Sequence, residues 1–322
     1  MADRAVVALR RVVREFLTPL ECGELAVAVS GGADSLALTE ATAHAGHRLG
    51  LAVRALVVDH GLQEGSAQVA SDAAALARKL GADSAEVLTV AVTGSGGPEA
   101  AARRARYAAL RGALSRDDAL VLLGHTRDDQ AETVLLGLGR GSGPRSVAGM
   151  RRLDRPWGRP LLDVPRSLTR QACAELGAKP WEDPHNADPR FTRVRLRNEV
   201  LPLLEDVLNG GVSAALARTA AQVREDLEAL DALADELLAE ARDGAGLDAA
   251  VLAAAPPALR RRALRTWLLE AGVRDLTEGH LRSVDALAGD WRGQGGVWLP
   301  GGLVAGRAHG RLALNSRETK GE

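Results

Sequence analysis

Cysteine and aromatic residues are both scarce in this chain of 322 residues. The two cysteines, Cys22 and Cys173, are too few for a disulfide framework, and they form no Cys-x-x-Cys pair of the kind that usually binds zinc or an iron–sulfur cluster. This composition is typical of a reducing compartment. Aromatic residues make up 2% of the chain, so we expect a core of alanine, leucine and valine.

Long apolar segments are also lacking. No stretch approaches the ~18 uninterrupted apolar residues of a membrane-spanning helix. Residues 1–21 have charges every few positions and no clean apolar region, so they do not resemble a signal peptide. Hydrophobic residues at 46% and charged residues at 26% are ordinary for a globular protein. The length favours about two domains, and we expect a cytoplasmic protein that does not associate with a membrane.

Lysine occurs only at Lys79, Lys179 and Lys320, so arginine supplies nearly all of the 41 basic residues. The formal net charge of −1 conceals a basic segment, because residues 140–197 contain 13 basic and 6 acidic residues. A basic surface of this kind suits a phosphate backbone. Arginine used as a general surface residue would give the same counts, and composition alone leaves the two explanations equal.

The first half of the chain alternates between predicted strands and helices. The apolar runs that predict buried parallel strands are residues 25–30, 53–60, 85–92 and 119–125. The segments that predict helices are residues 34–48, 66–80, 99–114 and a stretch that begins near 127. This alternation predicts an α/β fold with a Rossmann-like, mainly parallel sheet covered by helices on both faces, and a ligand at the carboxyl ends of the strands.

The second half has a different pattern. Residues 140–200 are rich in Gly, Pro and Arg and predict loops and short elements, whereas residues 212–242 and 256–288 predict helices. Residues 293–315 predict short strands between glycine turns. We place a domain boundary near residue 205, followed by a smaller, mostly helical domain.

A loop of small residues follows the first predicted strand. Its members are Ser30, Gly31, Gly32, Ala33, Asp34 and Ser35. The glycines permit a tight turn and a close approach of backbone amides to an anion, and the next helix directs its N-terminus at that anion. The loop is neither a Walker A motif nor a dinucleotide-binding Gly-x-Gly-x-x-Gly motif. A plain strand-to-helix turn is the alternative explanation.

Polar residues follow two further strands at the same predicted edge. Asp59 and His60 end the second strand, where they would face a nucleotide, although a capping Asp beside an exposed His is the more frequent explanation of such a pair. His125 ends the fourth strand. Asp129 and Glu132 are three residues apart in the helix that follows, so their carboxylates share one face and could hold an ammonium group or a metal. Simple first-turn acids are the alternative.

Two groups of arginines complete the motifs. Arg103 and Arg106 lie within about one helical turn, so both can project toward one region, and the planar guanidinium suits phosphate. Arg193, Arg195 and Arg197 are spaced by two, which predicts an extended stretch with all three on one side. An arginine-rich surface is the alternative in both cases.

The motifs SGGADS, VDHGL, ARRARY, HTRDDQAET, RPLL and WEDPHNADPRFTRVRLR occur in this order. Together, over roughly residues 23–205, they resemble the tRNA(Ile)-lysidine synthetase family of PP-loop ATP pyrophosphatases. The remaining C-terminal region looks like the helical substrate domain of that family. The chain departs from the family pattern at Thr126, where a second histidine is usual, and at Gln63, where arginine is frequent.

This resemblance implies a reaction and two domains. ATP would adenylate the C2 oxygen of the wobble cytidine in an isoleucine tRNA with a CAU anticodon and release diphosphate. The ε-amine of L-lysine would then attack C2 and expel AMP, forming lysidine. Residues 1–205 would form an N-type ATP pyrophosphatase catalytic domain with a basic connector, and residues 206–322 a helical tRNA-binding domain. The sequence does not decide whether the protein forms a homodimer.

The resemblance also implies roles for the residues named above. The loop from Ser30 to Ser35 would bind the pyrophosphate of ATP, with Asp34 close to Mg²⁺ and with Asp59 and His60 at the nucleotide. Further residues would act in catalysis or bind tRNA. The catalytic set is Asp34, Arg103, Arg106, His125, Asp129 and Glu132; of these, Asp129 and Glu132 would bind lysine, and Arg193, Arg195 and Arg197 would bind tRNA. Trp157, Trp181 or Phe191 could stack on bases, although a core position is favoured for each.

Three other functions compete with this one. A PP-loop tRNA thiolase uses the same loop, but such enzymes generally need catalytic cysteines or an iron–sulfur cluster, and Cys22 and Cys173 are isolated. A non-catalytic RNA-binding protein would not need the intact SGGADS loop. A small-molecule amide ligase would not need the basic connector and often has a glutaminase segment, which this chain lacks.

Overall fold

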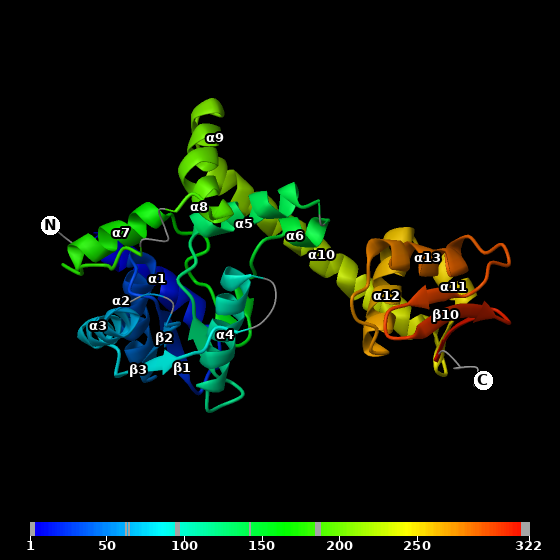
Figure 1. Cartoon of the computed structure of the whole chain (residues 1–322), viewed down its shortest axis with the longest axis horizontal. Coiled ribbons are helices and arrows are strands. Elements are labelled where there is room, and N and C mark those ends of the chain that lie inside the picture. Colours follow the sequence, from blue (N-terminus) through cyan, green and yellow to red (C-terminus); the bar gives the residue numbers. More distant parts are fainter. Residues whose placement is uncertain are drawn as a thin grey trace. The chain divides into compact units, whose positions relative to one another are not determined.

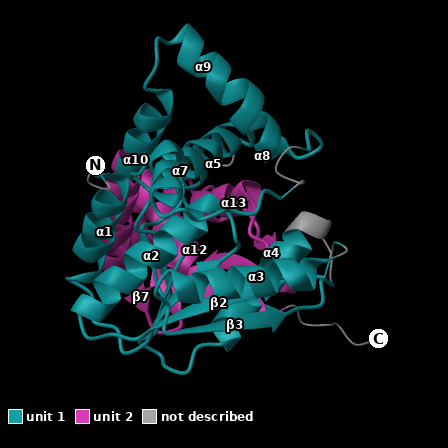
Figure 2. Cartoon of the chain, turned by 90° about the vertical axis from the view of Figure 1, so that its left-hand side faces the viewer, with its two compact units in different colours: residues 1–221 teal, residues 222–322 magenta. Residues whose placement is uncertain are grey.

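The computed structural model describes residues 4–61, 63, 65–93, 97–141, 143–183 and 188–316. The chain forms two compact units, Met1–Ala221 and Gln222–Glu322, which are coloured separately in Figure 2. The division falls within the long helix α10 (Val212–Ala241). The functional boundary that we expect near residue 205 stays a prediction. Each unit is described by itself below.

The first unit contains a six-stranded sheet with the order β3-β2-β1-β4-β6-β5; β1, β2 and β3 are labelled in Figure 1. Its strands are β1 (Leu25–Val29), β2 (Val53–Asp59), β3 (Ser84–Thr89), β4 (Leu120–Leu122), β5 (Leu153–Asp154) and β6 (Trp157–Gly158). All neighbours pair in parallel except β5 and β6. This confirms the predicted mainly parallel sheet. The last two strands have two residues each, too few to give a recognisable pattern within the Gly/Pro/Arg-rich segment.

The first unit also contains the helices that precede, connect and follow these strands. They are α1 (Arg4–Leu17), α2 (Ala33–Arg48), α3 (Ser66–Lys79), α4 (Pro98–Gly112), α5 (Arg127–Gly139), α6 (Pro144–Val147), α7 (Arg166–Glu175), α8 (Thr192–Arg195), a π-helix (Leu196–Val200) and α9 (Leu201–Val207). Alternate residues of β1 enter two different apolar clusters: Val27 packs with residues of α1 and α2, and Ala26 packs with Leu110 of α4. Successive side chains of a strand point to opposite faces, so helices cover both faces, as predicted.

The strand ends place the functional motifs at one edge. Val29 pairs with Val57 and Val27 with Leu122, so Ser30, His60 and Gly124 all follow strands that point the same way. Gly31 has a φ of +82°, which favours glycine. A Cβ atom on Gly124 would lie 3.2 Å from the backbone of Asp34. Small residues therefore let the end of β4 approach the start of α2.

The segment with Arg193, Arg195 and Arg197 is helical, which corrects our expectation of an extended stretch. It spans α8 and the π-helix. Arg195 pairs along the helix with Glu199 at 2.9 Å, whereas Arg193 and Arg197 both reach Glu132 of α5. The alternation of charged and apolar residues suggested the period of a strand, but the pairing of Arg195 with Glu199 four residues later is an interaction that stabilises a helix. The three arginines do not share one side.

The second unit combines helices with an antiparallel sheet of order β7-β8-β11-β10-β9. Its elements after α10 are β7 (Arg242–Asp243), β8 (Gly246–Asp248), α11 (Ala249–Ala254), α12 (Pro257–Glu270), α13 (Glu278–Gly289), β9 (Val297–Leu299), β10 (Leu303–Ala308) and β11 (Arg311–Ser316). Trp267, Val284 and Leu312 lie in its core. The helices and the C-terminal strands agree with the sequence pattern.

No single helix among the described residues is long and apolar enough to span a membrane. One bent pair of helical segments, Thr192–Val207 with Val212–Ala241, has the length and composition of a membrane span. The two parts of this pair meet at an angle of 96°.

Candidate active site

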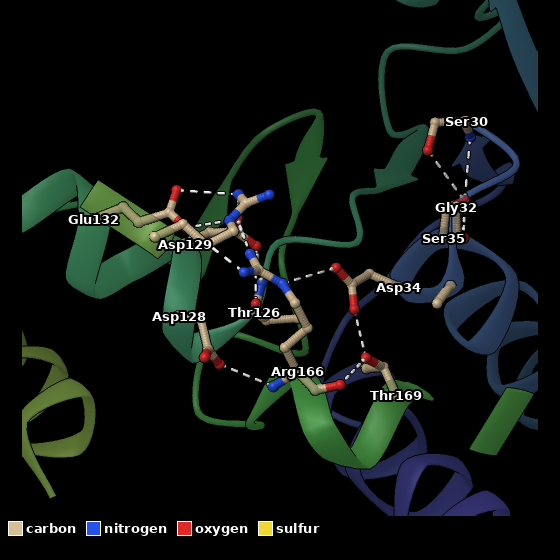
Figure 3. Close-up of polar contacts among 12 residues, drawn as sticks. Ser30, Gly32, Asp34, Ser35, Thr126, Asp128, Asp129, Glu132, Arg166 and Thr169 are labelled. Atoms are coloured by element: carbon tan, nitrogen blue, oxygen red, sulfur yellow. Dashed lines mark hydrogen bonds and ion pairs between the residues drawn. The ribbon is translucent and has the colours of Figure 1, made fainter. Parts of the chain in front are cut away.

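The loop after β1 is held by its own serines. The Ser30 amide donates to the Ser35 hydroxyl oxygen at 3.2 Å, and the Ser35 hydroxyl donates to the Gly32 carbonyl at 2.8 Å (Figure 3). Gly32 precedes α2 and supplies no side-chain cap to that helix. The first amides of α2 therefore keep their hydrogen-bonding capacity and their partial positive charge for an anion.

Two histidines at the neighbouring strand ends have buried ring nitrogens. The Nδ1 atoms of His60 and His125 have no hydrogen-bond partner among the described residues. Burial lowers the pKa of both imidazoles, and the charge of Arg106 lowers both further. For His125 the pKa falls to about 3. Both rings are therefore neutral at pH 7, and each has one ring nitrogen available to a ligand.

Arg103 and Arg106 lie against the single tyrosine. Their guanidinium carbons are 4.9 Å and 5.5 Å from the ring centroid of Tyr107. Tyr107 in turn meets Trp157 edge-on at a centroid distance of 4.8 Å. Trp157 is 6% exposed, so it belongs to the core and cannot stack on an RNA base. Tyr107 therefore packs against both arginines, and Arg106 is near enough for its charge to act on both histidines.

Asp129 and Glu132 come together, as their spacing predicts, and basic residues surround both (Figure 3). Asp129 accepts hydrogen bonds from the Thr126 amide at 2.8 Å and from Arg166 Nη2 at 2.6 Å. The Glu132 side chain is fully buried and receives Arg197 Nε at 2.7 Å and Nη2 at 3.2 Å. Burial acts to raise the pKa of Asp129, but Arg166 and the Thr126 amide outweigh it and lower the pKa.

Asp34 faces the same group from the start of α2. It accepts a hydrogen bond from the Thr169 hydroxyl and lies 3.4 Å from Arg166 Nε. Burial raises the pKa of Asp34, opposed by Thr169 and Arg166. Among the described residues no group of three or more His, Cys, Asp or Glu side chains could hold a metal ion alone. One carboxylate beside a phosphate-binding loop nevertheless fits Mg²⁺, which commonly takes one or two carboxylates together with substrate phosphates.

Asp59 and the two departures from the family pattern have local partners. Asp59 is buried and accepts a hydrogen bond from the Gly61 amide at 3.0 Å. Thr126 is buried at the start of α5, where its hydroxyl lies 2.9 Å from Asp129. Gln63 donates to Asp183 at 3.2 Å. Thr126 therefore positions Asp129 through this contact. A histidine at the same position would place an imidazole, which has a different shape, beside Asp129.

Arg166, Thr169 and Asp128 are site residues that the sequence pattern missed. Arg166 begins α7, and its backbone amide donates to Asp128 Oδ2 at 2.8 Å. Arg166 and Thr169 reach Asp34 across more than 130 residues of chain. Asp128 lies within the HTRDDQAET motif, and Arg166 and Thr169 follow the RPLL motif, but neither motif by itself indicates these contacts.

A cavity of about 190 Å³ adjoins the acids. Its lining includes Asp128, Glu132, Arg166 and Arg197 as well as the apolar Leu201. It therefore offers charged groups of both signs beside an apolar side chain.

Comparisons with known proteins match both parts of the chain. A PP-loop domain model matches residues 6–204, and a TilS substrate binding domain model matches residues 247–313. The chain is 60% identical over 316 residues to the tRNA(Ile)-lysidine synthase of Rhodococcus jostii, covering 96% of this chain and 95% of that protein. It is 59% identical over 314 residues to the enzyme of the same name from Nocardia farcinica, covering 95% and 97%.

A solved structure also shares the fold. The U34-tRNA thiolase from Methanococcus maripaludis, with its [4Fe-4S] cluster, has a TM-score of 0.56 and 18% identity to this chain. It covers 70% of this chain and 81% of its own length. At this identity the likeness establishes the fold alone.

Proposed function

The chain belongs to the tRNA(Ile)-lysidine synthase family, and from this premise we propose how its sheet edge joins L-lysine to the wobble cytidine of an isoleucine tRNA with a CAU anticodon. The enzyme is a ligase that uses ATP at its PP-loop domain. The observation that supports the mechanism most strongly is the meeting, at one edge of the sheet, of an anion-binding loop and a pair of acids.

The first step is adenylation of the cytidine C2 oxygen. The amides of the loop from Ser30 to Ser35 and the N-terminus of α2 bind the departing diphosphate. Arg103 and Arg106 stabilise charge that develops at the α-phosphate. His60 and His125 are neutral, so each donates or accepts a hydrogen bond at the nucleotide without adding charge. Asp59 orders the turn that presents His60.

Mg²⁺ belongs at Asp34 in this scheme. The carboxylate lies at the N-terminus of α2, close to where the phosphates bind, and its side chain is 25% exposed. When bound, the metal neutralises phosphate charge as diphosphate leaves. The Thr169 hydroxyl and Arg166 hold the Asp34 carboxylate in place.

The second step uses the lysine side chain. Asp129 and Glu132 attract the ε-ammonium group, and one of them accepts its proton as the amine attacks C2. The burial of Glu132 strengthens its attraction for a cation, because the local dielectric constant is low. The amine displaces AMP from the adenylated carbon, so the nucleotide leaves after lysine has bound.

The tRNA contacts come from both parts of the chain. Residues 206–322, which include the substrate binding domain match, are proposed as the tRNA-binding domain and residues 1–205 as the catalytic domain. Arg195, 61% exposed in its side chain, is well placed for a phosphate. Arg193 and Arg197 both lie beside Glu132. In this proposal they contact tRNA and remain close to that acid at the same time. A homodimer remains a proposal that sedimentation equilibrium would test.

Sulfur transfer is disfavoured by the cysteines. Cys173 is 2% exposed and lies behind the loop, where burial raises the pKa of its thiol to about 11. The nucleophilic form of cysteine is the thiolate. Cys173 is therefore a core residue, unsuited to accept sulfur or to bind a cluster.

One assay separates these functions. The enzyme is mixed with ATP, Mg²⁺, a CAU isoleucine tRNA and labelled lysine, and the RNA is analysed for label. Lysine in the RNA with release of AMP supports the ligase. A requirement for a sulfur donor would indicate the thiolase, and failure to release AMP in the presence of tRNA would indicate a non-catalytic RNA-binding protein.

A further inference from the structure

The proposed lysine site already contains a cation. Arg166 places Nη2 2.6 Å from Asp129 and Nη1 3.6 Å from Glu132, between the two acids that should attract the lysine ammonium (Figure 3). Only 12% of its side chain is exposed. Lysine therefore cannot pair closely with both acids while this guanidinium stays where it is.

The charges around the site are almost balanced before lysine binds. The acids are Asp34, Asp128, Asp129 and Glu132, and the cations are Arg166, Arg193 and Arg197. An added ammonium group would meet three guanidinium groups as well as four carboxylates. An ammonium group would bring this sum to zero, but it can contact both Asp129 and Glu132 only if the guanidinium that now lies between them moves aside, since like charges repel strongly in a partly buried site.

Of these three arginines, Arg166 is the one that also contacts a carboxylate outside the pair of acids, because Arg193 reaches Glu132 and Arg197 reaches Glu132 and Asp129. The Nε atom of Arg166 lies 3.4 Å from Asp34, on the side of the phosphate-binding loop, whereas Arg197 makes a two-point contact with Glu132. The backbone of Arg166 is fixed separately by Asp128. Its side chain can thus turn toward the loop without displacing α7.

We infer that Arg166 is an exchangeable counter-ion: its guanidinium fills the ammonium position between Asp129 and Glu132 until the triphosphate bound at the loop attracts it away. This inference rests on the proposed function of the acids and adds an order of binding, in which ATP precedes lysine. Arg166 is a positioning residue, and through it ATP prepares the lysine site. Coupling of this kind is reciprocal, so bound lysine also favours the arrangement that binds ATP.

The test measures lysine affinity with and without a nucleotide. Equilibrium dialysis of labelled lysine is performed on the full chain with tRNA transcript present, with or without Mg²⁺ and α,β-methylene ATP, which cannot be cleaved between the α and β phosphates. For the wild type we expect the nucleotide to tighten lysine binding about tenfold, within the usual range of coupling between sites.

Arg166→Gln removes the counter-ion and leaves the acids unbalanced. We expect this variant to bind lysine about tenfold more tightly than the wild type without nucleotide, and the nucleotide to have little further effect. Arg170→Gln is the matched control, because Arg170 is exposed on the same helix and should behave as the wild type. Thermal melting checks that each variant is folded.

Two results would overturn the inference. Lysine binding that is weaker in Arg166→Gln under both conditions would mean that Arg166 only supports the acids, and unchanged binding would mean that it does not compete. If Arg166→Gln fails to fold, Arg166→Lys replaces it: the shorter reach of its ammonium toward the phosphates should reduce the nucleotide effect, and an undiminished effect would contradict us. Incorporation of lysine into tRNA by the wild type, measured in parallel, shows that the proposed function itself still holds.

Discussion

Two halves of the sheet edge differ in how completely their polar groups are paired. The first, which we call the anion half, comprises the loop Ser30–Ser35 with His60, Arg106 and His125. It contains helix amides without a side-chain cap and two buried ring nitrogens without a partner among the described residues. The second, the acid half, comprises Asp128, Asp129 and Glu132, which are already paired: Asp128 accepts the backbone amide of Arg166, and Asp129 and Glu132 form ion pairs with Arg166 and Arg197.

This difference indicates which ligand each half can accept directly. A phosphate group can enter the anion half and satisfy groups that burial has left without water, which favours binding. An ammonium group entering the acid half must replace an existing ion pair, so its binding is a difference between two similar interactions. Asp34 belongs to the loop of the anion half, and Arg166, which lies 3.4 Å from Asp34 and 2.6 Å from Asp129, links it to the acid half.

The largest effect should come from this junction. Asp34→Ala removes the proposed metal ligand and should lower turnover by about 10³-fold, a loss of the size seen when a group that stabilises transition-state charge is deleted. Affinity for tRNA should stay within about twofold, measured by filter binding. Asp163→Ala, at an exposed acid, is the control. Turnover retained in Asp34→Ala would place the metal elsewhere.

Within the acid half, Glu132→Gln should separate lysine from ATP. Removing the buried charge should raise the KM for lysine by about 10- to 100-fold, because hydrogen bonds to charged groups are worth roughly 1.5–3 kcal/mol. The KM for ATP should change much less. Glu199→Gln, which alters an exposed pair with Arg195, is the matched control. Unaltered lysine kinetics in Glu132→Gln would refute the ammonium site.

Within the anion half, His125 should act without titrating near neutral pH. Its lowered pKa of about 3 keeps the ring neutral as the pH falls from 8 to 5. His125→Asn should slow adenylation by about fivefold, because it removes a hydrogen bond worth roughly 1 kcal/mol, and the ratio of wild-type to variant rates should be constant across this range. Single-turnover adenylation gives the rates. A ratio that falls below pH 6.5 would show that the imidazole becomes protonated there.

Arg195 and Arg197 extend the comparison to RNA. Arg195 is exposed and should contact one phosphate, so Arg195→Ala should weaken tRNA binding and reduce the slope of log affinity against log salt by about 1. Arg193→Ala should act in the same direction. Arg197 pairs with the acid half, and Arg197→Gln should alter lysine binding more than the salt slope. Equal salt slopes in all variants would move the RNA path elsewhere.

The smallest effect concerns the hydrogen bonds between α9 and the start of α10. Glu205 accepts the backbone amides of Val212 and Ser213 at the start of α10, and these hydrogen bonds lower its pKa. Glu205→Gln should cost about 1 kcal/mol in the free energy of unfolding at pH 7. Since the pKa is lower in the folded state, this contribution should be lost as the pH falls below the ordinary value of 4.5. Asp206→Asn, on the exposed side of α9, should have no such effect in thermal melts.

Local pattern predicted the anion half better than the acid half. The loop Ser30–Ser35 and His125 lie directly at strand ends, so the strand pattern alone places them at one edge. The partners of the acids come from distant segments, because Arg166 begins a helix that had no distinct pattern and Arg197 lies in a segment that we expected to be extended. Tertiary ion pairs decided both, and no local propensity encodes them.

The most direct measurement observes the two steps one after the other, first adenylation at the anion half and then the attack of lysine at the acid half. The enzyme is incubated with α-labelled ATP, Mg²⁺ and a CAU isoleucine tRNA without lysine, and the RNA is examined for label before and after lysine is added. We expect the RNA to acquire label before lysine is added. Lysine should then release this label as AMP in the wild type, and the release should be much slower in Glu132→Gln. RNA that never acquires label from a fully active enzyme would contradict it.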